Sequence, residues 1–166
     1  MRRTTVLDPA TVVSIRAIFL HREHRVTLDE AARMLGWTRA RLKEAIDAGE
    51  ISVVEMCGGK RVIEIRELAH YAVYEWPFHV IEKALGREAS LIIPPALRTR
   101  KLTLRLPQCY IQLLEILASE NQQSVTKYLE LMCDELLFNE KERLTALLPY
   151  GVEAYYWPLE VPEDLS

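Results

Sequence analysis

Three polar side chains recur at every second position of one short segment: Lys101, Thr103 and Arg105. Lysine and arginine donate hydrogen bonds to the guanine acceptors of the DNA major groove, and threonine can bond a base edge or touch a thymine methyl group. The three positions between and after them, 102, 104 and 106, are all leucine. This period of two predicts a β-strand with one polar, basic face and one apolar face.

Such a strand needs a partner, because a lone strand leaves backbone groups unpaired along both edges. No nearby segment has the pattern of its hairpin partner. The simplest partner is the same strand of a second copy, so we expect a homodimer whose leucines face the helices that follow.

Two helices are predicted after the strand. The first begins at Pro107, a residue that the first helical turn tolerates, and the segment Asn121-Gln122-Gln123 interrupts the apolar pattern. Ser124 is a favourable N-cap for the second helix. Apolar residues at helical spacing predict a buried stripe on each helix: Tyr110, Leu113, Leu114 and Leu117 on the first, and Val125, Tyr128, Leu129, Met132 and Leu136 on the second.

Residues 100–138 resemble the ribbon-helix-helix family of DNA-binding repressors, of the Arc and MetJ type. The resemblance implies an intermolecular two-stranded antiparallel ribbon in the major groove, with Lys101, Thr103 and Arg105 on base edges. It also implies that backbone N–H groups at Ser124 and Val125 clamp a DNA phosphate, because a helix N-terminus has free donors and a positive dipole end.

One residue of this segment departs from the family, which usually has glycine where this chain has Gln122. Either Gln122 takes a positive φ or the turn differs. The alternative for the whole segment is dimerisation alone, with the basic strand face in solvent.

The amino-terminal half has a second pattern. Thr27 with Glu30 forms a predicted capping box, which starts a helix ending at Gly36, and Arg39 starts another that ends at Ala48. Two strands over 51–56 and 61–65 flank a turn with Gly58-Gly59, where glycine supplies positive φ. A third helix is expected over 66–76, ended by Pro77.

This order of elements resembles the winged helix of the MerR and excisionase families. The resemblance places four residues, Thr38, Arg39, Arg41 and Lys43, on a recognition helix in the major groove, and two, Lys60 and Arg61, on a wing. Where these families commonly have an arginine on that helix, this chain has Glu44, and acidic side chains slightly outnumber basic ones over residues 25–76. Affinity for nucleic acid depends on phosphate neutralisation. DNA contact and protein contact by this domain therefore remain equally open.

Composition limits the classes of function. The 166 residues, 49% hydrophobic, fit one or two small domains, and a net charge of −3 means that DNA binding must come from local patches. Three cysteines, Cys57, Cys109 and Cys133, lack zinc-site spacing and suit a reducing cytoplasm; the last two are expected to be buried on helices. Without a signal-peptide pattern or membrane-length apolar run, we expect a cytoplasmic protein.

Chemistry beyond binding is not indicated. The sequence has no phosphate-binding glycine loop, no metal-ligand cluster and no recognisable pair of nucleophile and base. We therefore expect neither enzymatic activity nor a metal or other cofactor.

Four regions follow from these patterns. We expect a winged-helix domain over 1–86 that includes a leading helix at 9–23, an extended connector over 87–99 whose apolar part docks, a ribbon-helix-helix domain over 100–138, and a tail over 139–166. The prolines Pro94 and Pro95 motivate the connector. The tail is acidic, aromatic and rich in proline, so it either binds a partner protein or packs Tyr155, Tyr156 and Trp157 on the chain's own domains.

The expected fold class is α+β, mostly α. The expected function is that of a homodimeric, sequence-specific DNA-binding transcriptional regulator with double-stranded DNA as its partner. The alternative is an antitoxin or adaptor whose tail binds a partner protein. A tail ordered against its own domains in the free protein would count against that alternative.

Overall fold

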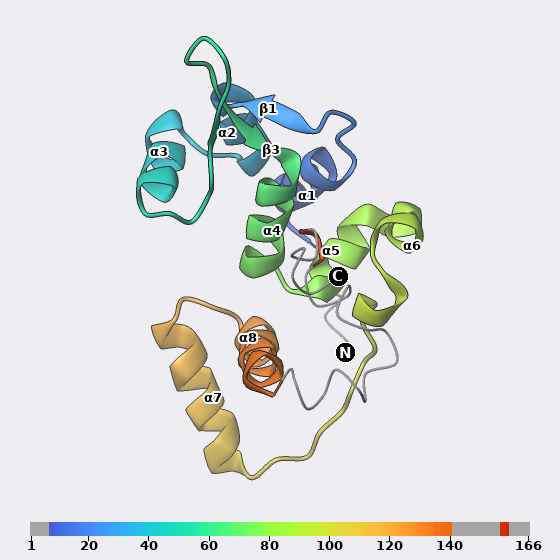
Figure 1. Ribbon diagram of the computed structural model, residues 1–166. Coiled ribbons are helices and arrows are strands. Elements are labelled where there is room, and N and C mark those ends of the chain that lie inside the picture. The colour runs from blue at the N-terminus through green and yellow to red at the C-terminus, as the bar shows by residue number, and fades with distance from the viewer. Residues whose placement is uncertain (1–6, 141–156, 160–166) are drawn as a thin grey trace.

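A computed structural model describes residues 7–140 and 157–159. These residues form a mostly helical protein with one small antiparallel sheet, as the α+β, mostly α class predicts (Figure 1). Among the described residues, no helix combines the length and the hydrophobicity needed to cross a lipid bilayer.

Helix α1 (Pro9–Phe19) starts the described part of the chain. The carboxylate of Asp8 accepts a hydrogen bond from the Thr11 N–H at 3.3 Å, which caps the helix. The sequence predicted a helix to residue 23, but α1 ends at Phe19 because the chain then turns into strand β1 (Arg25–Thr27). The sequence analysis missed β1, which has three residues and one buried side chain, Val26.

Helices α2 (Leu28–Leu35) and α3 (Arg39–Asp47) follow, and both begin where the sequence predicted. The hydroxyl oxygens of Thr27 and Thr38 each accept a hydrogen bond at 3.3 Å from the backbone N–H three residues later. Gly36 ends α2 with a φ of 68°, in the left-handed region that glycine adopts without a steric cost.

The sheet has the order β1-β3-β2, with both pairs antiparallel. The central strand β3 (Arg61–Glu64) pairs Ile63 with Val26 of β1, and Val62 with Val54 of β2 (Val54–Glu55). The predicted turn is confirmed, with a φ of 89° at Gly58. The predicted strand over 51–56 is shorter, because the Ser52 N–H donates to the Glu67 carboxylate at 3.4 Å instead of to a strand.

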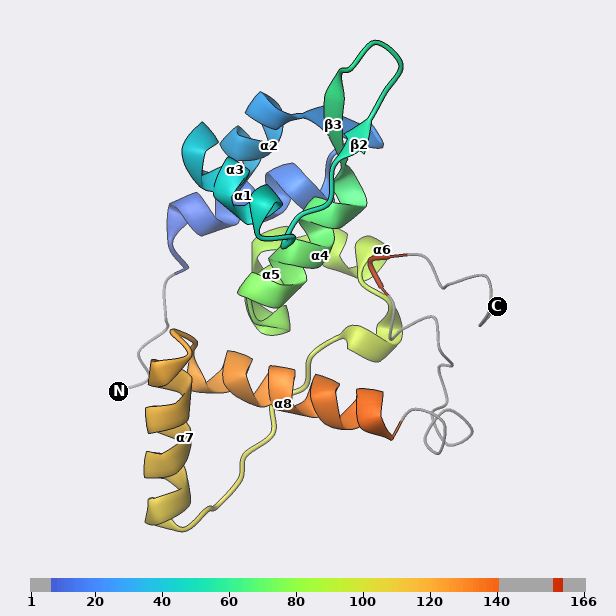
Figure 2. The ribbon, with the colours of Figure 1, turned by 60° about the vertical axis from the view of Figure 1, so that its left-hand side comes forward.

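Helices α4 (Ile65–Glu75) and α5 (Phe78–Leu85) complete the amino-terminal part, and α1 joins its two cores. Ile18 of α1 belongs to a core built on α2, α3, β3 and α4, whereas Ile15 belongs to a second core that α5 shares. Figure 2 shows α1 between the α2–α3 pair and α5.

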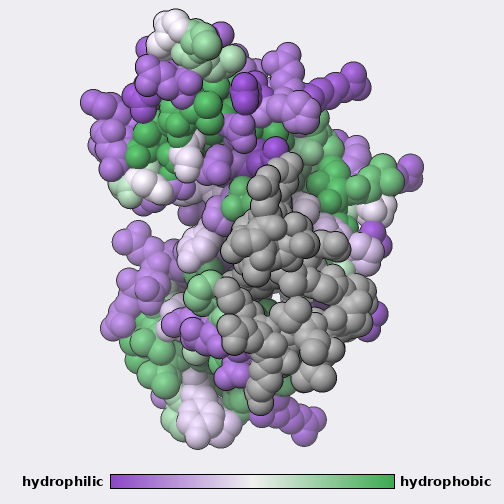
Figure 3. Space-filling view, in the orientation of Figure 1, coloured by the Kyte–Doolittle hydropathy of each residue, from purple (hydrophilic) through white to green (hydrophobic). Residues whose placement is uncertain are grey.

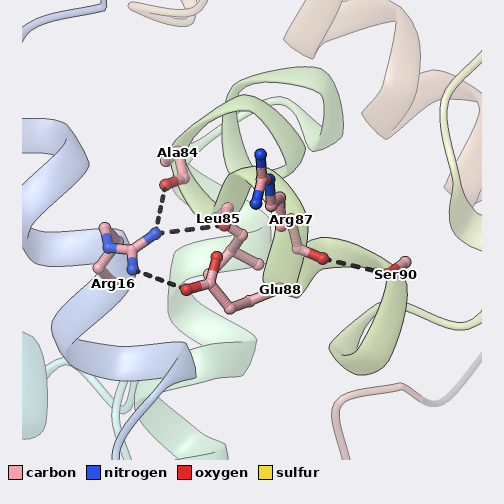
Figure 4. Close-up of polar contacts among 6 residues, drawn as sticks. All are labelled: Arg16, Ala84, Leu85, Arg87, Glu88 and Ser90. Carbon is pink, nitrogen blue, oxygen red and sulfur yellow. Dashed lines mark hydrogen bonds and ion pairs between the residues drawn. The ribbon is translucent and has the colours of Figure 1, made fainter.

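Arg16 fastens α1 to the end of α5. Its Nη1 donates to the carbonyl oxygens of Ala84 and Leu85, each at 3.2 Å, and its Nη2 lies 3.1 Å from the Glu88 carboxylate (Figure 4). Carbonyl groups at a helix end lack partners within the helix. The Arg16 guanidinium supplies these missing hydrogen-bond partners and thereby holds α1 against the end of α5.

The connector over 87–99 is not extended, which corrects the prediction. It forms three short helical turns, η1 (Gly86–Glu88), α6 (Ala89–Ile92) and η2 (Pro95–Leu97). Pro95 takes the first position of η2, where a helix does not need its N–H. The apolar part does dock, as expected, because Ile93 is buried in the second core.

The carboxy-terminal part consists of helices α7 (Gln108–Glu120) and α8 (Val125–Asn139), which pack on each other. The predicted N-cap is confirmed, since the Ser124 hydroxyl accepts the Lys127 N–H at 3.1 Å. Gln122 has a φ of 55°. Of the two alternatives for this turn, the structure therefore shows the left-handed residue.

Trp157 in the tail packs on the chain's own domains. Its ring stacks on Phe19 with centroids 5.7 Å apart and lies 6.2 Å from the ring of Phe78. The prediction of a self-packed tail is confirmed for this residue, while Tyr155 and Tyr156 lie outside the described residues.

Candidate nucleic-acid interface

Lys101, Thr103 and Arg105 lie in an exposed segment, residues 99–107, that contains neither helix nor strand. Their side chains have no hydrogen bond or ion pair among the described residues. The predicted strand is therefore not formed in the single chain, because none of the described residues offers it a partner strand. Pairing with a second copy stays a prediction.

The leucines of this segment are also uncovered. Leu102, Leu104 and Leu106 are 76%, 62% and 41% exposed. The prediction that they face the helices concerns the homodimer and stays a prediction, because no described residue covers them in the single chain. Every residue from 99 to 107 is exposed, so the leucine side chains stay largely in solvent.

The predicted buried stripes of α7 and α8 are largely exposed as well. Ala118 is the one buried hydrophobic residue that the structure describes on the two helices. Cys109 and Cys133 are exposed, which corrects their predicted burial. Figure 3 shows apolar surface gathered where α7 lies in Figure 1. Two helices that pack on each other along one side cannot enclose these stripes. The exposed apolar residues of α7 and α8 are Tyr110, Ile111, Leu113, Ile116, Leu129, Met132, Leu136 and Phe138.

On the amino-terminal part, Arg39, Lys43 and Arg61 line one shallow pocket between α3 and β3. The structure thus brings together two predicted recognition-helix residues and one wing residue. Arg39 is already engaged, with its Nε 2.5 Å from Oδ1 of Asp29 and its Nη2 3.0 Å from Oδ2. A DNA phosphate would compete with this carboxylate for the guanidinium.

Arg41, the remaining predicted basic residue of the recognition helix, does not line this pocket. Its guanidinium carbon is 4.4 Å from the centroid of the Trp37 ring, and that ring meets Tyr71 edge to face at 5.1 Å. Burial, and then the carboxylates of Glu75 and Glu50, raise the pKa of Tyr71 to about 12. The surroundings of Arg41 are aromatic and acidic, so they do not favour a phosphate.

Lys60 and Arg61 stand at the β2–β3 hairpin, as predicted, and both are exposed. The Lys60 carbonyl accepts the Met56 N–H at 2.8 Å, which closes the hairpin. The Lys60 ammonium has no partner among the described residues and is therefore accessible to a phosphate.

Ser124 and Val125 hold the start of α8, as predicted, with Ser124 exposed and Val125 half-buried. Backbone N–H groups here are those of a first helical turn, which lack partners inside the helix. Thr38 is likewise the N-cap of α3 and is exposed.

The sequence analysis missed a cluster of charges on α8. Lys127 is 1% exposed, and its Nζ donates to the Val73 carbonyl at 2.6 Å and lies 3.6 Å from Oε2 of Glu130. Both Glu130 carboxylate oxygens lie 3.3 Å from the Phe78 N–H, which donates to them. We call Lys127, Glu130, Val73 and Phe78 the α8 docking contact. A Lys–Glu pair at i, i+3 is common on exposed helices, so its sequence did not indicate burial.

The two candidate reading surfaces lie far apart. In Figures 1 and 2, residues 100–107 and α7 lie at one end of the molecule, while α3 and the β2–β3 hairpin lie at the other. The predicted ribbon and the predicted recognition helix of one chain therefore do not form a continuous surface.

Comparisons of the chain with protein-family models, with curated protein sequences and with solved structures found no match. Its function has to be inferred from its residues and their geometry.

Proposed function

We propose that this chain is a homodimeric, sequence-specific DNA-binding transcriptional regulator of the cytoplasm, whose principal reader is a ribbon-helix-helix segment at residues 100–138. The observation that carries the proposal is the pattern of residues 101–106. Basic and polar side chains alternate there with leucines that are 41% to 76% exposed in the single chain. Large apolar side chains left exposed in this number, together with those of α7 and α8, favour an interaction site.

A second copy covers this surface in the proposed dimer. The two 100–107 segments pair as antiparallel strands, which satisfies the backbone groups that the single chain leaves unpaired. The leucines then turn onto α7 and α8 of both copies, which also encloses the stripes that remain open in one chain. The same alternation places Lys101, Thr103 and Arg105 on the outer face of the ribbon.

The ribbon enters the major groove, where Lys101 and Arg105 donate to guanine acceptors and Thr103 contacts a neighbouring base. Backbone N–H groups at Ser124 and Val125 bind a phosphate beside the ribbon. These phosphate contacts position the ribbon, while the base contacts give specificity.

The amino-terminal part acts in this proposal as a MerR-like winged helix with an auxiliary role. Four of its basic side chains face a possible DNA backbone or a protein partner: Arg39, Lys43, Lys60 and Arg61. We assign no catalytic role to the chain.

The antitoxin or adaptor alternative depends on a tail that is free to bind a partner. Trp157 already packs between Phe19 and Phe78, which counts against a free tail at this residue. The regulator is therefore the favoured proposal.

Selection of bound duplexes from a random pool, at two salt concentrations, tests the proposed function. Sequence-specific binding predicts one enriched motif at both concentrations, because base contacts survive when salt weakens the phosphate contacts. Enrichment that lacks a motif and vanishes at the higher salt would contradict the proposal.

A further inference from the structure

In the α8 docking contact, each charged side chain bonds to a helix end that carries the opposite partial charge. Val73 lies in the last turn of α4, where carbonyl groups carry the negative end of the helix dipole, and the Lys127 ammonium binds its oxygen. Phe78 is the first residue of α5, where N–H groups carry the positive end, and the Glu130 carboxylate accepts its hydrogen bond. Two charges one turn apart on α8 therefore hold both sides of the corner between α4 and α5.

This contact lies next to the start of α8, which the proposed function assigns to DNA phosphate. Lys127 is the third residue of α8, and Gln123, just before the N-cap, lines a pocket with the side chains of Tyr74, Glu50 and Glu75. A phosphate held by the N–H groups of Ser124 and Val125 would approach these carboxylates. Like charges repel strongly where solvent is partly excluded.

We propose that the α8 docking contact is autoinhibitory: it holds the first turn of α8 against the α4–α5 corner, and α8 leaves this corner when DNA is bound. The inference rests on the proposed function, because it concerns the phosphate site of the same ribbon-helix-helix segment. Docking places the carboxylates of Glu50 and Glu75 near the helix start that a DNA phosphate would use, so docking weakens DNA binding.

The two charged residues of the contact, Lys127 and Glu130, separate from the corner together. Burial lowers the pKa of Lys127 and raises the pKa of Glu130, so both charged forms lose hydration in the docked state. Loss of either residue removes the nearest opposite charge from the other, which is unfavourable for a partly buried charge. Undocking returns that charge to water.

The chain segment before α7 allows the α7–α8 pair to move away from the corner. Thr99 is hydrogen-bonded to the Glu82 carboxylate through its backbone N–H at 2.8 Å and through its hydroxyl, which anchors the chain to α5. Residues 100–107 then run to α7 without helix or strand. The α7–α8 pair can therefore leave the corner by rotation about this segment while Thr99 stays in place.

The test uses Lys127→Ala and Glu130→Ala in the full chain, with anisotropy of a fluorescein-labelled duplex of mixed sequence at one salt concentration. The two substitutions change the charge of α8 in opposite directions. Charge alone would make Lys127→Ala bind DNA more weakly and Glu130→Ala bind it more tightly. Opening of the docking contact makes both bind more tightly, by up to about tenfold if about a tenth of the wild-type molecules are open.

Glu135→Ala is the matched control, because Glu135 is an exposed carboxylate of α8 outside the contact. Small-angle scattering gives an independent reading of docking, and the Lys127→Ala and Glu130→Ala variants should both have a larger radius of gyration than the wild type and the control. Far-UV circular dichroism should show unchanged helix content.

Weaker binding by Lys127→Ala, or a larger radius without tighter binding in either variant, would overturn the autoinhibitory role and leave the proposed function standing. An unchanged radius in both variants would also overturn it. If neither the wild type nor any variant bound the duplex, the proposed function itself would fail and this inference with it.

Discussion

Asp29 on α2 holds Arg39 on α3 through two contacts, Nε to Oδ1 at 2.5 Å and Nη2 to Oδ2 at 3.0 Å. Arg39 is a predicted DNA contact, and this carboxylate competes with phosphate for its guanidinium. Both side chains are mostly exposed, so the pair contributes little to stability.

We therefore expect Asp29→Ala to strengthen DNA binding through the α3 face by a factor of about 1.4 to 5, because an exposed ion pair is worth about 0.2 to 1 kcal/mol. The melting temperature should stay nearly constant. Asp47→Ala removes the same charge from α3 without releasing Arg39 and serves as the control in an anisotropy titration. Equal effects of the two substitutions would mean that the ion pair is irrelevant to binding.

The exposed leucines make a prediction about assembly. Leu104→Glu places a charge on the apolar face of the proposed ribbon, so sedimentation equilibrium should show a shift from dimer to monomer. Leu91→Glu is the control, because Leu91 is 86% exposed and lies on α6 outside that face. A dimer that persists in the Leu104→Glu variant would show that another surface joins the two copies.

The Tyr71 hydroxyl should titrate at a higher pH than that of an ordinary tyrosine. Burial and the neighbouring Glu75 and Glu50 carboxylates raise its pKa from 10.0 to about 12. The neutral phenol is thus favoured by folding, so its contribution to stability is complete below pH 10.0 and is lost as the pH rises through about 12. Ultraviolet titration should show a late component that Tyr71→Phe removes. A titration curve unchanged by Tyr71→Phe would contradict this assignment.

The turn between α7 and α8 predicts a stabilising substitution. Gln122 has a φ of 55°, which is costly for a residue with a Cβ atom but not for glycine. Gln122→Gly should raise the free energy of unfolding by up to about 1 kcal/mol. Gln123→Gly, next to it but outside the left-handed region, should lower it. Urea denaturation of the two variants decides between these signs.

Local signals of the sequence proved informative about local structure. Thr27 and Ser124 start their helices as predicted, because capping depends on one side chain and the backbone three residues later. The turn at Gly58 followed from the same kind of signal. Features that depend on tertiary contacts were not predicted. Strand β1 has too few residues to show a period of two. The connector forms helical turns in which Ile93 is buried in a core.

In the candidate site too, the sequence predicted positions along the chain better than it predicted contacts between elements. The winged-helix resemblance placed Arg39 and Lys43 on one helix, where they line one pocket, but it did not reveal the Asp29 pair or the ring under Arg41. The burial of Lys127 was not predictable, because nothing in the sequence of α8 indicates that the Val73 carbonyl group lies opposite this side chain. The apolar stripes of α7 and α8 were predicted to be buried, but an apolar pattern does not say which surface covers it, and the single chain leaves these stripes largely exposed.

DNA binding by the double variant Lys101→Ala, Arg105→Ala tests the central claim most directly. The exposed arginines Arg22 and Arg87, outside both reading surfaces, provide a charge-matched double-alanine control. With the selected duplex, anisotropy should show a loss of about fivefold or more per ribbon side chain, since a base contact is worth about 1 to 3 kcal/mol. The control should bind nearly as well as the wild type, and both variants should remain dimers. Sequence-specific binding that survives the loss of Lys101 and Arg105 would contradict a ribbon that reads DNA.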